Sequence, residues 1–449
     1  MTAEITSAVW SLLAAFWWLL VFAAIAPLAH STWLFYRQTD FKKKLEWVLL
    51  ELQMPREIKK SPRAMEMALA QIHQLRNAPG DIKEWYYDGE VTRWFSLELA
   101  SFGGETHFYL RCYVKYRDLV EAAIFAYYPD VEITEVEDYV ERFPQNTQEM
   151  YRQGYNLWGS EMRLARHAAY PIRSYLDFES PDEDKQYDPI GTFLEVLSKV
   201  QREQMVAIQI LITPITDDWK KSAADIVSKL SEMRKSPTSA SKAKLKASFP
   251  GGPLPSFETV APTKEEGFQF RGLLRSPGET DVLKAVENNL AKPSYNTLIR
   301  FIYFSPHALY YDSFPRRGIT GAFNQYGSSD LNMFKRNDNV STKTEVWNWP
   351  HLFSKIRVEY RKQRLLYNFR ARRTPETYFI GKLVTSHLFN LNFYSREFPL
   401  STESLATLFH PPTFQVLTAP HIQRVDSRKA GPPAGLSIFG GEEDIEKYQ

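Results

Sequence analysis

The sequence predicts an α+β protein in which one N-terminal transmembrane helix precedes two ferredoxin-like β-α-β-β-α-β modules and a mixed C-terminal region. Three observations lead to this prediction: an uncharged apolar run at residues 8–29, a strand and helix pattern at 45–145, and a similar pattern at 160–304. A content of 44% hydrophobic and 24% charged residues in 449 residues is typical of a folded globular chain.

The apolar run at residues 8–29 is long enough to cross a bilayer. A hydrocarbon core of about 30 Å needs about 20 helical residues. A cleaved signal peptide would begin with basic residues and end at a small-residue cleavage site. Here Glu4 is acidic, and Pro27 follows the small residues and hinders cleavage. We therefore expect an uncleaved anchor.

Basic residues follow the anchor and predict its orientation. Arg37, Lys42, Lys43 and Lys44 come directly after it, whereas no Lys or Arg precedes it. By the positive-inside rule, the N-terminus lies outside and the body lies in the cytoplasm, which predicts a single-pass protein of the inner membrane.

The first module, residues 45–145, has clear turn and cap signals. Ser61-Pro62 is typical of a helix start, and Gly103-Gly104 between two apolar runs indicates a β-hairpin. We interpret Cys112 as a core residue and His107 as a packed or paired residue, because both lie inside a predicted strand.

The second module, residues 160–304, repeats this order around a Ser/Lys/Pro/Gly-rich insertion at 236–266, which composition predicts to be flexible. Its expected strands are 169–178, 205–213, 267–275 and 297–304, and its expected helices are 188–200 and 279–290. The similarity of the two patterns indicates an internal duplication. Residues 305–428 form the mixed region, and 429–449 are expected to be a flexible tail.

No catalytic motif is present. The sequence contains no phosphate-binding G-x-x-x-x-G-K-[ST], no H-E-x-x-H and no G-x-S-x-G. The single cysteine, Cys112, excludes an intramolecular disulfide and a cysteine-rich zinc site. The acidic side chains of Glu135, Glu137 and Asp138 are interpreted as a solvated strand face rather than as a carboxylate pair for catalysis. We expect no enzyme activity and no cofactor.

The most distinctive charge feature is a basic stretch at residues 357–373, in which aromatic residues are interleaved. Its candidate contact residues are Arg357, Arg361, Lys362, Arg364, Tyr367, Arg370, Arg372 and Arg373. Guanidinium groups pair with phosphates, and aromatic rings stack on bases. The stretch is compatible with nucleic acid, with anionic lipid or an acidic protein partner, and with a solvated face of an amphipathic element.

Several segments carry a resemblance to a known family. They are Trp47-Val-Leu-Leu-Glu51, Trp94-Phe-Ser-Leu-Glu98, Gly103-Gly-Glu-Thr-His-Phe108, Tyr127-Tyr-Pro-Asp130, Leu157-Trp-Gly159 and Ser404-Leu-Ala-Thr-Leu-Phe-His-Pro411. Together they resemble the membrane-anchored N-terminal region of conjugative-transfer, type IV secretion-like ATPases of candidate-phyla bacteria, a region that also occurs as a standalone family.

The resemblance covers roughly residues 8–436 and implies a function without implying a catalytic site. The chain carries no motor domain, so no ATPase residue can be transferred to it. The resemblance implies a non-catalytic accessory or scaffold component of a translocation machine, acting with a separate P-loop ATPase and with DNA or protein as cargo. We also expect a homo-oligomer, in which the α+β domains present surfaces to a hexameric motor or to each other.

Overall fold

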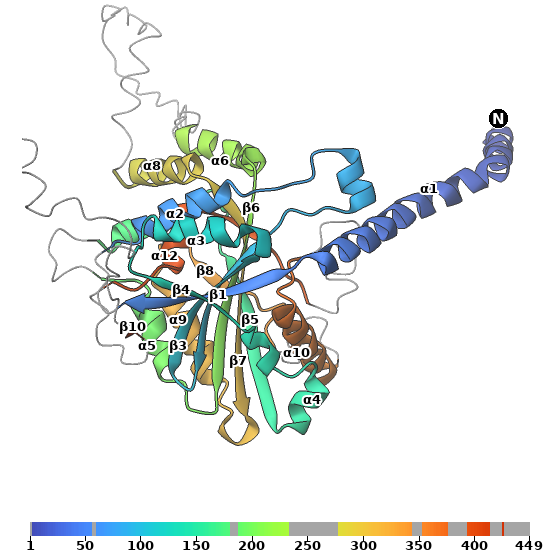
Figure 1. The fold of residues 1–449 in the computed structure, drawn as a ribbon. Coiled ribbons are helices and arrows are strands. Elements are labelled where there is room, and N and C mark those ends of the chain that lie inside the picture. Colours follow the sequence, from blue (N-terminus) through green and yellow to red (C-terminus); the bar gives the residue numbers. More distant parts are fainter. Residues whose placement is uncertain are drawn as a thin grey trace, which may run out of the picture.

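The computed structural model describes residues 2–55, 60–179, 187–232, 277–343, 353–375, 393–413 and 424–425. In these ranges the protein is mixed α+β, with a long N-terminal helix, α1 (Thr2–Lys44), that projects from a body built on one sheet (Figure 1). The predicted insertion at 236–266, the strand at 267–275 and the tail at 429–449 lie outside the described residues.

The first half of the sheet agrees closely with the elements expected at 45–145. It contains β1 (Trp47–Pro55), α2 (Arg63–His73), β2 (Phe95–Phe102), β3 (Glu105–Tyr113), α3 (Arg117–Phe125) and β4 (Glu132–Val136). The strands pair antiparallel in the order β4-β1-β3-β2. The predicted hairpin turn is confirmed at Gly103 and Gly104, which have φ values of +61° and +94° that favour glycine.

The second half differs from the expected elements. It contains β5 (Tyr155–Leu164), α5 (Gly191–Ser198), β6 (Met205–Pro214), β7 (Ser294–Pro306), α9 (Ser313–Asn324) and β8 (Phe334–Arg336). The strand expected at 169–178 is wrong: these residues, which include Pro171, form turns and one 3-10 turn at Tyr175–Asp177. The true first strand, β5, begins before residue 160 and extends to residue 164.

The helix expected at 279–290 forms, as α8 (Pro277–Ala291), but it does not cross the sheet. It packs instead on α6 (Lys221–Glu232), in a small cluster with buried Ala169, Ala223 and Val286. The helix that connects β7 to β8 is α9. The four strands of this half pair in the order β8-β5-β7-β6.

The two halves share one sheet. β2 pairs antiparallel with β6 over its whole length, from Phe95 opposite Ile212 to Phe102 opposite Met205. The short strands β9 (Phe398–Ser401) and β10 (Arg424–Val425) add to β7 and β1. The body is therefore a continuous sheet with a mirrored strand order on its two sides, rather than two separate modules.

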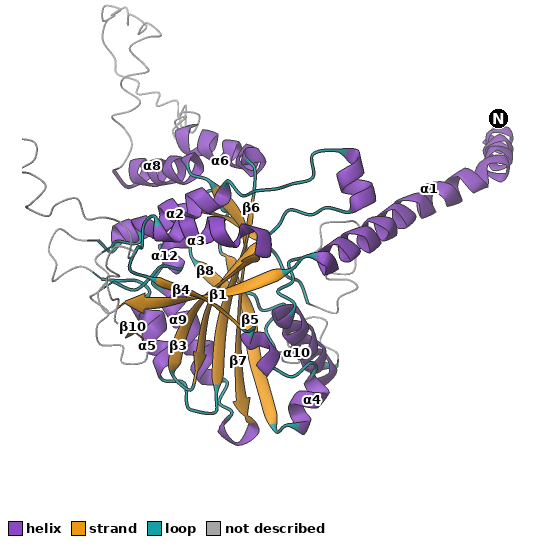
Figure 2. Cartoon of the chain, viewed as in Figure 1, coloured by secondary structure: helices purple, strands orange, loops and turns teal. Residues whose placement is uncertain are grey.

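Helices cover both faces of this sheet (Figure 2). On one face, α2, α3, α5, α9 and α12 (Thr402–Leu408) enclose a large core to which Leu50, Leu97 and Phe301 contribute. On the other face, α10 (Ser354–Arg370) and α4 (Thr147–Arg152) enclose a smaller core around Leu365 and Phe369.

Two individual predictions for the first half are confirmed. Cys112 is fully buried in the larger core. His107 is paired, because its Nδ1 atom lies 2.6 Å from the Glu51 carboxylate. Between α2 and β2 a loop extends outward and carries a single π-helical turn, η1 (Glu84–Asp88), beside α1.

Candidate membrane-proximal functional site

The loop that carries η1 is joined side-on to α1. The Trp33 indole nitrogen donates to the Tyr86 carbonyl oxygen over 2.7 Å, and Arg37 donates to the Tyr87 carbonyl oxygen. Gly89 ends the turn at φ +67°, where an added Cβ would lie 2.4 Å from the Arg37 backbone. A side chain at position 89 would therefore separate the loop from the helix.

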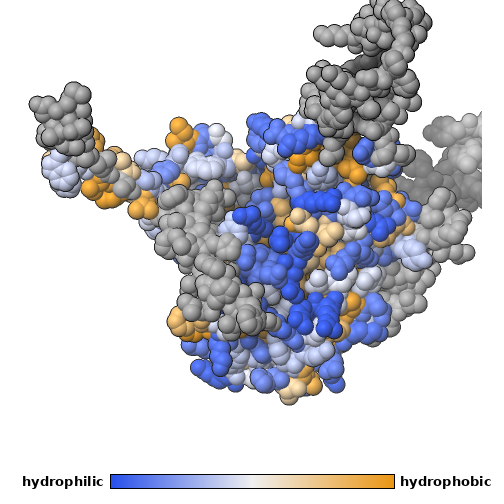
Figure 3. All heavy atoms as spheres, turned by 180° about the vertical axis from the view of Figure 1, so that it is seen from behind, coloured by the Kyte–Doolittle hydropathy of each residue, from blue (hydrophilic) through white to orange (hydrophobic). Residues whose placement is uncertain are grey.

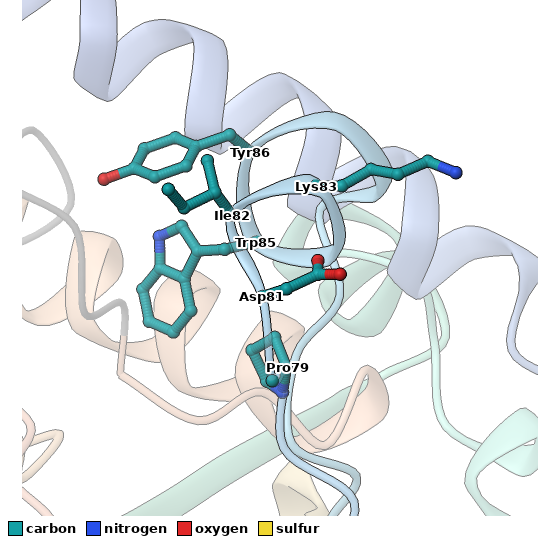
Figure 4. A pocket seen from close by; sticks show the side chains of 7 residues that line it. Pro79, Asp81, Ile82, Lys83, Trp85 and Tyr86 are labelled. Carbon is teal, nitrogen blue, oxygen red and sulfur yellow. The ribbon is translucent and has the colours of Figure 1, made fainter.

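The outer side of this loop is apolar. Ile82, Tyr87 and Trp85 expose 77%, 67% and 41% of their surface, which is unusual for large apolar side chains in one short segment. Figure 4 shows that Ile82, Trp85 and Tyr86 project from one side of the turn, with Lys83 on another side.

The apolar side of the loop lies next to a helix that is itself apolar and exposed. Residues Ala14–Lys44 of α1 form a helix that is long and apolar enough to cross a membrane. The hydrophobic side chains of α1 are visible in Figure 3, where they contrast with the mostly hydrophilic body. Because the loop contacts α1 at residues 33–37, its exposed apolar side chains lie beside the C-terminal part of this apolar helix.

A basic pocket lies where α1 meets the sheet. Its volume is about 210 Å³, and it is lined by side chains from the end of α1, from β1 and β3, and from the end of α10. Four of these side chains are cationic: Lys42, Lys43, Arg111 and Arg373. Among the residues that the structure describes, no Asp or Glu lines this pocket.

A buried ion-pair network holds the end of α10 against the sheet next to this pocket. The Arg372 guanidinium donates to the Glu98 carboxylate, with a shortest distance of 2.5 Å, and to both Asp138 carboxylate oxygens at 2.6 and 2.9 Å. Tyr139 also donates to Glu98 over 2.5 Å. Arg372 itself has φ +45°, a conformation that costs a non-glycine residue free energy and that the ion pairs maintain.

A second buried ion pair, between β7 and β5, also contacts the C-terminal end of α10. Arg300 on β7 pairs with Glu161 on β5 over 2.9 Å, and neither side chain is more than 1% exposed. Arg300 also donates to the carbonyl oxygens of Asn368 and Arg373 at 3.0 and 3.1 Å. The C-terminal carbonyl groups of α10, which carry the negative end of the helix dipole, thus face a buried cation.

The structure separates the eight residues that the sequence grouped as one contact surface. Arg357, Arg361, Lys362 and Arg372 are buried. Arg361 donates to the carbonyl oxygens of Asp338 and Ser341, at 3.1 and 2.8 Å. Because these four cations are buried, residues 357–373 do not form a continuous basic surface.

The other four of these residues are at least partly accessible. Arg364 lies 6.0 Å from the Phe393 ring, and Arg370 donates to the Val140 carbonyl oxygen over 2.9 Å. Tyr367 and Arg373 are joined by a 3.1 Å hydrogen bond and both line the basic pocket. The structure therefore brings only these two of the eight together in one site.

Sequence reasoning missed Arg111 and misinterpreted Asp138. Arg111 is a single cation among the mostly apolar residues of β3, and this position could have indicated a candidate functional residue. Asp138 was interpreted as part of a solvated face, but it pairs with buried Arg372, whereas Glu135 does form an exposed pair with Arg117 at 2.6 Å.

The polar clusters among the described residues are shielded from solvent and hold elements of the fold together. No group of three or more His, Cys, Asp and Glu side chains in these residues could hold a metal ion. His410 donates to Asp188 over 2.8 Å, and Asp188 accepts two further bonds from Thr413. Both side chains of this pair are at most 1% exposed, so the pair joins α12 to the start of α5 and leaves no opening for a substrate.

The fold and the site together define an α+β protein with one N-terminal helix that is long and apolar enough to span a membrane, and with a basic pocket beside it. Residues 38–423 match the family described as Domain of unknown function (DUF8128), and the chain belongs to that family. No match is found among curated proteins.

Proposed function

We propose that the protein is a non-catalytic, membrane-anchored scaffold that holds its sheet in a fixed orientation at the cytoplasmic face of the inner membrane. The observation that carries this proposal is the contact between α1 and the η1 loop. A helix followed by a flexible linker would let the body move freely. Here α1 continues without a break to Lys44, β1 begins at Trp47, and the loop contacts the helix from the side.

The two halves of the sheet fit a scaffold built from two copies of one module. Each half has the element order β-α-β-β-α-β and the strand order that a ferredoxin-like motif has, with its fourth strand outermost and its second strand at the shared centre. We propose that the halves are such modules, with α6 and α8 inserted in the second. An extended sheet with helices on both faces offers wide surfaces to partner proteins.

The resemblance stated above suggests the assembly in which the scaffold acts. We propose an accessory role in a type IV secretion-like or conjugative DNA-transfer apparatus, next to a separate P-loop ATPase. Self-association of the chain is part of the same proposal. Burial of Arg357, Arg361 and Arg372 disfavours the alternative of a nucleic-acid adaptor that uses the whole stretch 357–373.

Photo-crosslinking in cells tests the partner. A crosslinking amino acid replaces Leu119 or Tyr311, which are 54% and 63% exposed on the body. We expect a P-loop ATPase to be captured, whereas the purified full-length chain in nanodiscs hydrolyses no ATP because it has no phosphate-binding loop. The control position is Ile82, which should capture lipid. Capture of no ATPase at either body position, or ATP turnover that co-migrates with the pure chain, would contradict the proposal.

Cysteine labelling tests the orientation. Cys112 is fully buried, and burial raises the pKa of its thiol to about 12, so it stays unlabelled on either side of the membrane. A cysteine at Thr2 should react with an impermeant maleimide in intact cells. A cysteine at Tyr187, which is 71% exposed, should react only after the membrane is opened. The reverse pattern would refute a cytoplasmic body.

A further inference from the structure

The loop that carries η1 has an apolar side and a charged side. Ile82 and Trp85 are exposed large apolar side chains. Figure 4 shows that both project to the same side of the turn as Tyr86, whereas Lys83 projects to another side. A short element whose surface is divided in this way is typical of segments that lie at the boundary between lipid and water.

The apolar side of the loop faces the part of α1 that is expected to cross the membrane. The ring of Tyr86 lies 5.2 Å from the ring of His30, measured between their centroids. His30 directly follows the uncharged run at 8–29, so it lies about 1.5 Å along the helix axis from the end of that run. Ile82 and Trp85 project to the same side as Tyr86 and therefore toward the level at which the uncharged run ends.

The polar groups of the loop bond to one another. The Glu84 carboxylate accepts a hydrogen bond from the Gly80 N–H over 2.7 Å, and the Asp81 carboxylate accepts one from the Glu84 N–H over 2.8 Å. A segment enters a region of low water content at acceptable cost only when its polar groups have partners. These bonds therefore lower the cost of moving the loop out of water.

The position of the loop gives such a contact a mechanical consequence. A single membrane-spanning helix sets the depth of the body but leaves it free to rotate about the helix axis. The loop contacts α1 from the side, through Trp33 and Arg37, so it lies away from that axis. A second attachment at this place would fix the rotation and the tilt of the body.

We propose that the η1 loop is a second membrane contact, which inserts Ile82, Trp85 and Tyr86 into the lipid–water interface beside α1. The proposal rests on the proposed membrane anchoring through α1. The partner is the lipid bilayer, because the apolar side of the loop adjoins the exposed aromatic surface of α1 at Trp33 and Tyr36, and aromatic rings are enriched at the headgroup level.

Fluorescence quenching in nanodiscs tests this contact with two neighbouring reporters. A bimane label is attached to the full-length chain at Ile82→Cys or at Lys83→Cys, since both positions are exposed and Cys112 is buried. Lipids brominated on their acyl chains should quench the Ile82 label several-fold more strongly than the Lys83 label, which projects away from the apolar side. Aqueous iodide should quench the two labels in the opposite order.

Trp85→Asp tests whether the apolar side chains cause the insertion. With the label at Ile82→Cys, this substitution should remove most of the quenching by brominated lipid, because a carboxylate is costly in an apolar layer. Leu119→Asp introduces the same charge at a position on α3 that is 54% exposed, and it should leave the quenching unchanged.

Equal quenching of the two labels, or quenching that Trp85→Asp does not reduce, would overturn the proposal. An Ile82 label that is shielded from iodide in native membranes but open to it in nanodiscs would also overturn it, since a partner protein would then cover the loop. Failure of the anchoring proposal would appear separately, as release of the full-length chain from membranes by alkaline carbonate. A chain that resists carbonate while its Ile82 label stays open to iodide would refute the loop contact alone.

Discussion

Replacing Arg372 with methionine is expected to lower the free energy of unfolding by about 3–5 kcal/mol. The substitution leaves the Glu98 carboxylate, which is fully buried, without its cation. Breaking a buried ion pair from one side typically has a cost of this size, because the remaining charge stays desolvated. Urea denaturation of the full-length chain in detergent, followed by circular dichroism, measures the change.

The double variant Glu98→Leu/Arg372→Met is the control for this prediction. It removes both charges, and replacing a whole buried pair with apolar residues of similar volume is often neutral. We expect it to recover most of the lost stability. A single variant as stable as the wild type, or a double variant no better than the single one, would show that the pair does not hold α10 on the sheet.

The neighbouring ion pair between Asp138 and Arg372 predicts how the free energy of unfolding changes with pH. Burial alone would raise the pKa of Asp138, but the hydrogen bond and charge of Arg372 lower it below its usual value of about 4. A lowered pKa in the folded state adds stability above the unfolded pKa, and that stability is lost as the pH falls through the folded pKa. Arg372→Met should therefore flatten the decrease of stability below pH 4.

Replacing Gly89 with alanine is expected to detach the η1 loop from α1. An added Cβ would meet the Arg37 carbonyl carbon at 2.4 Å and its carbonyl oxygen at 2.6 Å, which are helix backbone atoms that cannot move aside. Positive φ adds about 1–2 kcal/mol of strain for any other residue. Once the loop is released, a nitroxide label at Ile82 should lose its fixed membrane depth, as measured by electron paramagnetic resonance.

Gly154→Ala is the matched control for this variant. Gly154 has φ +78° but no atom within 4 Å of an added Cβ, so its replacement introduces the backbone strain without the contact. We expect the Ile82 label to be unaffected by Gly154→Ala. If both alanine variants behave alike, the contact between Gly89 and α1 is not what fixes the loop.

Local signals predicted the first half of the sheet well and the second half poorly. The hairpin turn at Gly103-Gly104 and the helix start at Ser61-Pro62 lie next to the strands and the helix that they delimit. The sequence could therefore predict where those elements begin and end. In the second half the partner strands β6 and β7 are separated by residues 215–293. Hydrophobic periodicity identifies both α8 and α9 as helices, but it cannot show which of them connects to the last strand. The shared sheet depends on pairing between Phe95 and Ile212, which no local pattern encodes.

The basic stretch at residues 357–373 shows that sequence-based prediction has the same limit for the candidate site. Its charges were visible in the sequence, but the acceptors that bury them are distant along the chain: Glu98 for Arg372, and carbonyl oxygens near Asp338 for Arg361. The sequence named Tyr367 and Arg373 as candidate contacts, and it predicted that Lys42 and Lys43 face the cytoplasm. It could not bring them together with Arg111, because only the tertiary fold places β3, α1 and α10 around one cavity.

The most direct test of a membrane-seated scaffold is the depth of the η1 loop in a bilayer. A nitroxide at Ile82, which is 77% exposed, is compared with one at Tyr187, which is 71% exposed and precedes α5 in the chain. Figure 1 shows α5 on the other side of the body from α1. Both labels are measured in nanodiscs, with Cys112 buried and unlabelled. We predict that the Ile82 label is rich in collisions with oxygen, protected from a water-soluble nickel complex, and about 5–10 Å into the headgroup boundary. The Tyr187 label should be fully open to nickel. Equal nickel accessibility at the two positions would contradict a body seated on the membrane.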